Sequence, residues 1–138
     1  MPLPSVTPVP VPDRRSSSAS PLTLCAAAWF VPGAGHLLQG RTEKAVVFFV
    51  VLVGMFTVGL AFGGRLFPFR LAEPLVFLAA AAEWVLGLPR LVAALGGFGA
   101  GDVIRVTYEY GNTFLIAAGL LNALVVLDVY DLAIGRRR

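Results

Sequence analysis

One carboxylate lies inside a long apolar stretch of the chain. Glu83 is the ninth residue of the run from Leu75 to Leu95. A charge at the centre of a membrane helix costs about 2.5–3.5 kcal/mol, so such a group marks a functional site by default. Two roles stay open for it. Glu83 either carries protons or binds a ligand, or it is structural and bonds Arg90, Asn122 or Thr57.

Two further places combine side chains that could do chemistry. Histidine is the residue type whose ordinary pKa lies near neutrality, and the one histidine, His36, follows the small-residue break at 32–35. It is either a proton sensor or ligand, or a polar cap on an irregular turn. Asp128 and Asp131 are three residues apart and share one helix face. They could serve metal or proton chemistry, but pairing with a nearby arginine is simpler, and the candidates are Arg65, Arg70 and Arg136.

The usual catalytic and metal-binding patterns are missing from the sequence. One cysteine, Cys25, and one histidine exclude a self-contained Cys/His zinc site. There is no phosphate-binding loop, nucleophile elbow or zinc-protease motif. We therefore expect no catalytic residue, no metal, no cofactor and no enzyme activity.

Composition indicates where these residues lie. The chain is 57% hydrophobic and 14% charged, with a mean hydropathy of +0.80, whereas soluble domains carry about 25% charged residues. A chain of 138 residues cannot bury four long apolar runs inside itself. The lipid bilayer is therefore the expected partner. The net charge of +3 comes from cations at the ends of these runs, which is typical of topology signals and not of nucleic-acid binding.

A spanning helix needs about 20 apolar residues, and four runs qualify. We predict an all-α integral membrane bundle of four transmembrane helices over 21–38, 45–64, 75–95 and 113–134, which form a single membrane domain at 21–138. Whether 21–38, which Pro32 and Gly33 interrupt, spans or re-enters stays open. Residues 1–20 are rich in proline and serine and are expected to be a disordered tail.

Cytoplasmic loops carry the excess of lysine and arginine. With four spans and both termini inside, seven cations lie inside and four lie outside or near that edge. The inner set is Arg14, Arg15, Arg65, Arg70 and Arg136 to Arg138, and the outer set is Arg41, Lys44, Arg90 and Arg105. We expect a multi-pass protein of the bacterial cytoplasmic (inner) membrane with both termini in the cytoplasm.

Small residues four apart indicate helix contacts, because close backbone approach drives helix association in lipid. Gly59 with Gly63, and Gly119 with Ala123, have this spacing. We expect them to pack helices together within the chain, in a homo-oligomer or in a larger membrane complex.

Two motifs resemble known families. The stretch Pro32-Gly33-Ala34-Gly35-His36 with Gly40-Arg41, followed by an uncharged helix, resembles the bacterial P-G-x-G-H variant of the two-transmembrane-helix domain family. Residues 108–114, with Asn122 and 127–131, are similar to a bacterial family of uncharacterised small membrane proteins that pairs this ending with the turn. The resemblance implies a polytopic membrane protein and no known activity.

Two functions follow as hypotheses. In the first, the chain is a structural or interaction component that acts through helix packing, and Glu83, Asn122 and His36 fix the helix register. In the alternative, it is a small transporter or proton-coupled channel, and Glu83 is the titrating group.

Overall fold

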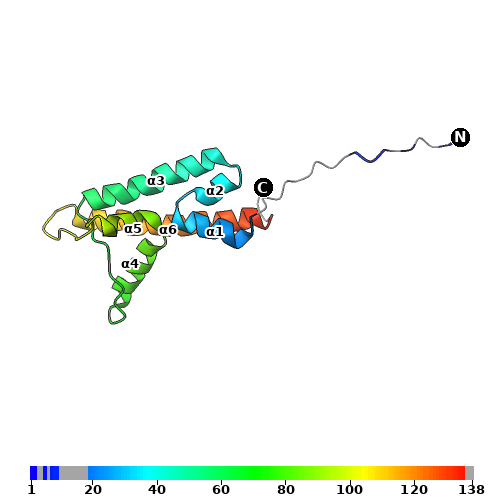
Figure 1. Ribbon diagram of the computed structural model, residues 1–138. Helices are drawn as coiled ribbons and strands as arrows, with labels where there is room; N and C mark the ends of the chain where they lie inside the picture. Colours follow the sequence, from blue (N-terminus) through cyan, green and yellow to red (C-terminus); the bar gives the residue numbers. More distant parts are fainter. Residues whose placement is uncertain (3–4, 6, 10–18, 136–138) are drawn as a thin grey trace.

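The computed structural model describes residues 1–2, 5, 7–9 and 19–135, and within these ranges it is all-helical, with six helices and no strand. The predicted disordered tail over 1–20 lies largely outside the described residues. The helices, shown in Figure 1, are α1 (Pro21–Phe30), α2 (Ala34–Leu38), α3 (Thr42–Ala61), α4 (Pro74–Trp84), α5 (Leu88–Leu95) and α6 (Tyr108–Ala133).

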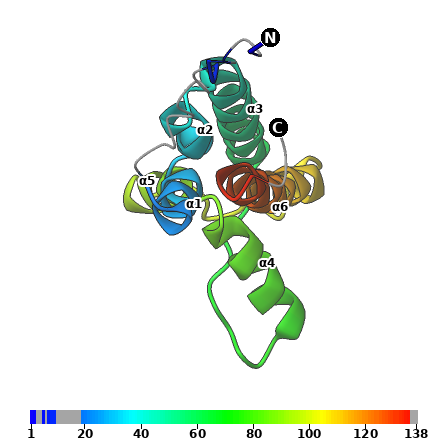
Figure 2. The same cartoon turned by 90° about the vertical axis from the view of Figure 1, so that its right-hand side faces the viewer.

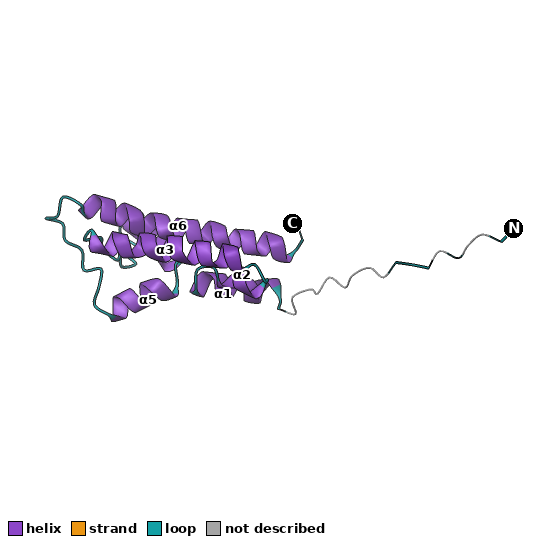
Figure 3. Ribbon diagram, turned by 90° about the horizontal axis from the view of Figure 1, so that it is seen from above, coloured by secondary structure: helices purple, strands orange, loops and turns teal. Residues whose placement is uncertain are grey.

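Two helices, α3 and α6, form the backbone of the bundle. They have 20 and 26 residues and are long and apolar enough to cross a membrane. They lie antiparallel and side by side (Figure 3), because Gly59 late in α3 packs against Leu115 early in α6, while Phe48 and Asp128 line one cavity near the other end. The prediction of an apolar helix over 45–64 holds, and the predicted helix over 113–134 begins earlier, at Tyr108.

The prediction of one helix over 21–38 is wrong, because the chain turns between α1 and α2. Gly33 at this turn has φ 85°, and a Cβ there would overlap the carbonyl oxygen of Ala45. Only glycine fits such a position. At about 1.5 Å per residue, the ten residues of α1 reach about 15 Å, which is half of a hydrocarbon core of about 30 Å.

Both ends of this broken helix lie beside the C-terminal half of α6. Leu24 and Ala28 in α1 form a buried cluster with Val129. After the turn, the Gln39 side-chain amide donates to the carbonyl oxygen of Val129 at 3.1 Å. Residues 21–39 therefore form a hairpin that returns to the end of α6 from which it starts (Figure 1).

The prediction of one helix over 75–95 is also wrong. The chain bends by 107° between α4 and α5, so α4 projects from the bundle while α5 lies along it (Figures 1 and 2). Gly87 at the bend has φ 67°, and a Cβ there would overlap the carbonyl oxygen of Trp29. The second break is thus packed against the end of α1, at the first break.

The segment that contains α4 and α5 also starts and ends in one place. The Leu66 N–H donates to the Gly99 carbonyl oxygen at 2.9 Å, and Arg65 pairs with Ala100 in an isolated antiparallel bridge. The Arg65 N–H also donates to Asn112 Oδ1, near the start of α6, at 2.8 Å. In the described part of the chain, two helices are therefore long and apolar enough to cross a membrane, or three if the bent pair of α4 and α5 is one span, against the four predicted.

Candidate functional site where two broken helices meet

The two broken helices meet at one buried amide. Asn122 lies near the middle of α6 and is fully buried. Its Nδ2 donates to the carbonyl oxygen of Ala28 in α1 at 3.3 Å and to that of Val85, just after α4, at 2.8 Å. One side chain thus binds a carbonyl of each broken helix, which ties both breaks to α6.

Glu83 and Arg90 hold a loop through its backbone. The Phe67 N–H donates to Glu83 Oε2 at 2.9 Å, and Arg90 Nη2 donates to the Phe67 carbonyl oxygen at 2.9 Å. Arg90 Nε lies 3.8 Å from Glu83 Oε2, an ion pair between two buried side chains. The two charges therefore neutralise one another and satisfy both polar backbone groups of Phe67.

Two aromatic rings complete this cluster. The Arg90 guanidinium carbon lies 4.3 Å from the centre of the Trp84 ring, a favourable cation–π geometry. Trp84 in turn stacks on Phe69 with their centroids 6.1 Å apart. Of the three partners expected for Glu83, Arg90 is correct and the other two are wrong. Asn122 instead donates to the carbonyl oxygens of Ala28 and Val85, and the Thr57 hydroxyl donates to the Val53 carbonyl within α3.

His36 bonds an aspartate, not the backbone near Pro32. Its Nε2 lies 2.8 Å from Asp128 Oδ2, its side chain is fully buried, and its ring tilts against Phe48 with a centroid distance of 5.0 Å. The expected pairing of Asp128 with Arg65 or Arg70 is wrong, because both arginines belong to the segment at the other end of α6, where Arg70 pairs with Glu73 at 3.2 Å. Arg136 lies outside the described residues.

The glycines predicted to pack helices have different roles. Gly119 touches α4 so closely that a Cβ would overlap the Ala82 carbonyl oxygen, and Gly59 meets Leu115 and the Gly111 carbonyl oxygen of α6. Gly63 is an incorrect prediction. It lies beyond the end of α3, in the turn that leads to Arg65, and faces Arg105 instead of a helix.

Several polar atoms in these clusters are buried without a hydrogen-bond partner in the described part of the chain. They include Glu83 Oε1, Asn122 Oδ1 and His36 Nδ1. Among the described residues, no three side chains of His, Cys, Asp or Glu gather closely enough to hold a metal ion. The polar groups thus form three separate contacts, which are the Asn122 amide with two carbonyl oxygens, the Glu83–Arg90 pair with Phe67, and the His36–Asp128 pair.

The sequence contained a signal for the second break that the prediction did not use. Gly87 comes two residues before Pro89, and glycine just past the end of one helix with proline in the first turn of the next is a pattern that separates two helices. Pro21, Pro74 and Pro89 each stand in the first two positions of a helix. The role of Phe67 had no such signal, because it acts only through its backbone.

These features define an all-helical protein with two long apolar helices, suited to a membrane, and two broken helices that meet at a buried asparagine. The chain belongs to the DUF6677 family, a family of unknown function whose model matches residues 23–138. No curated protein and no solved structure matches the chain.

Proposed function

We propose that the chain is a non-catalytic structural or interaction component of the bacterial cytoplasmic membrane. It acts by packing its helices against other membrane helices, and α3 and α6 are its two spans. The observation that carries this proposal is the use of its polar groups. Asn122, Glu83 and Arg90 each bond the backbone of a broken helix or of its loop. Groups used in this way support the fold, and they leave the outer apolar faces of α3 and α6 for lipid, further copies or a larger complex.

The proposed topology has two hairpins that enter from opposite sides. Residues 21–39 enter and leave on the side where α6 ends, and residues 65–100 do so on the side where α6 begins. The cations then divide seven to three, with Arg90 buried between α5 and the loop. The first side has Arg14, Arg15, Arg41, Lys44 and Arg136 to Arg138, and the second has Arg65, Arg70 and Arg105. This asymmetry supports a cytoplasmic location for the first side and for both termini.

Single-cysteine labelling of intact cells tests this topology. In a Cys25→Ala background, we expect an impermeant maleimide to label Arg70→Cys and Arg105→Cys almost completely and Lys44→Cys hardly at all. Four spans predict label at 44 and 105 but not at 70, so position 105 is the matched control. Label at position 44 alone would mean that both hairpins are present but that the protein has the opposite orientation in the membrane.

A flux measurement separates packing from transport. In vesicles loaded with a pH-sensitive dye, we expect the wild-type protein and Glu83→Gln to pass protons no faster than empty vesicles at any pH tested. Proton flux in the wild type that falls at least tenfold in Glu83→Gln would instead support the proton-coupled transporter. Mild-detergent purification with mass spectrometry then identifies the copies or partners that the packing proposal requires.

A further inference from the structure

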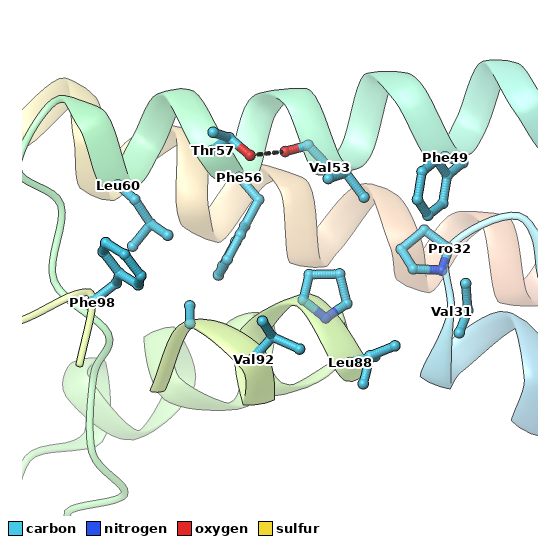
Figure 4. A pocket seen from close by; sticks show the side chains of 12 residues that line it. Val31, Pro32, Phe49, Val53, Phe56, Thr57, Leu60, Leu88, Val92 and Phe98 are labelled. Atoms are coloured by element: carbon cyan, nitrogen blue, oxygen red, sulfur yellow. Dashed lines mark hydrogen bonds between the residues drawn. The ribbon is translucent and has the colours of Figure 1, made fainter. Parts of the chain in front are cut away.

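An apolar groove follows α3 on the side of the two broken helices. Its first part, about 290 Å³, lies between α2 and α3. Its second part, about 300 Å³, lies between α3 and α5 and is shown in Figure 4. The two parts share Val31, Pro32 and Phe49, so they adjoin at the first helix break.

The lining of the groove suits a hydrocarbon chain. Val46 and Phe49 on α3 and Leu37 on α2 line the first part, and all three are about half exposed in the isolated chain. In the second part, Thr57 is the lining residue with a polar side chain, and its hydroxyl donates to the Val53 carbonyl at 2.8 Å. The lining of the groove is therefore almost entirely apolar, and each part has a volume at the lower end of small-molecule pockets.

Positive charge lies at the α2 end of this groove. Residues 40–44 lie where α2 connects to α3 and line a shallow hollow. They include the cations Arg41 and Lys44 and one carboxylate, Glu43. Within the described residues neither cation makes an ion pair, whereas Arg105, near the other end of α3, pairs with Asp102 at 3.4 Å. The charge at the mouth is therefore complementary to an anion.

The dimensions match one leaflet of a bilayer. From Lys44 to Val53, α3 rises about 13.5 Å at about 1.5 Å per residue, and half of a hydrocarbon core is about 15 Å. An acyl chain whose headgroup lies at Lys44 thus passes Phe49, where the two parts of the groove adjoin, and ends near Val53 in the second part.

We propose that this groove binds one anionic phospholipid, with the phosphate at Arg41 and Lys44 and an acyl chain between α2 and α3. This inference rests on the proposed location in a membrane but not on which side faces the cytoplasm. The bound lipid would cover the apolar surface that the short α2 leaves open beside α3.

Native mass spectrometry of the full chain in detergent, titrated with phosphatidylglycerol or phosphatidylcholine of the same acyl chains, tests the proposal. We expect one phosphatidylglycerol to bind at least tenfold more tightly than phosphatidylcholine. Arg41→Gln with Lys44→Gln should remove this preference. Ala34→Phe, which fills the groove from α2, should weaken both lipids.

A matched control separates the groove from general surface charge. Changing Arg136, Arg137 and Arg138 to glutamine removes three positive charges that follow α6 in the sequence and should leave the preference unchanged. Three results would overturn the proposal. The two lipids could bind equally well, or the preference could be lost in the Arg136 to Arg138 control. The third is that Ala34→Phe displaces a second copy of the chain instead of a lipid. A chain that stays in water without detergent would instead contradict the proposed membrane location.

Discussion

Gly119→Ala should destabilise the protein strongly, although it adds one methyl group. The new Cβ would overlap the carbonyl oxygen of Ala82 in α4, and this backbone atom cannot rotate away as a side chain can. Overpacking in a core costs about 1–3 kcal/mol, and we expect a value at the upper end of that range. The loss should appear as a lower midpoint of thermal unfolding in detergent and as less monodisperse protein in size-exclusion chromatography.

Gly54→Ala is the matched control for this substitution. Gly54 lies within α3, and a Cβ there meets no atom within 4 Å. Because alanine is the better helix former by about 0.5–1 kcal/mol, the control should be neutral or slightly stabilising. Equal midpoints for the two variants would show that α4 does not pack on α6 at Gly119.

Arg90→Ala should have the largest effect among the charged residues. It leaves the Glu83 carboxylate buried without its ion pair and removes the donor to the Phe67 carbonyl. Breaking a buried pair in this way costs about 3–5 kcal/mol. Thermal unfolding should show the loss, and limited proteolysis should show faster cleavage between residues 66 and 73.

Two comparison variants sharpen this test. Arg70→Ala breaks the Arg70–Glu73 pair, whose side chains are 56% and 53% exposed, and should cost less than about 1 kcal/mol. Arg90→Lys keeps the charge but lacks the planar guanidinium that reaches both Glu83 and Phe67, so it should restore only part of the stability. If Arg90→Ala unfolds like Arg70→Ala, the buried pair does not hold the loop.

Hydropathy predicted the long helices well and the broken ones poorly, for a physical reason. The run that became α3 has no charge or proline between Lys44 and Phe62 to interrupt it, so its apolar length alone defined a helix. The runs at 21–38 and 75–95 are also apolar, and hydropathy does not distinguish a continuous helix from two halves at an angle. The breaks depend on Gly33 and Gly87, whose positive φ values let the chain turn.

The sequence predicts which polar residues are important better than it predicts which partners they contact. The cost of a charge in an apolar run marks Glu83 as a candidate, the ordinary pKa of histidine marks His36, and the spacing from Asp131 marks Asp128. Only the Glu83–Arg90 partnership was foreseen, since both residues lie in one run. The His36–Asp128 contact joins residues 92 positions apart, and it forms because the first broken helix returns to the end of α6. Such a contact follows from the path of the chain and not from local sequence.

Arg65 pairs with Ala100, so the two ends of the segment that contains α4 and α5 are held together. The length of that segment therefore does not set how α3 and α6 pack. Because the chain leaves and re-enters at neighbouring residues, extra residues at the tip of this excursion would lengthen a loop without sliding α3 against α6. We therefore expect a tag or reporter inserted in the exposed turn at residues 71–72 to leave α3 and α6 in register.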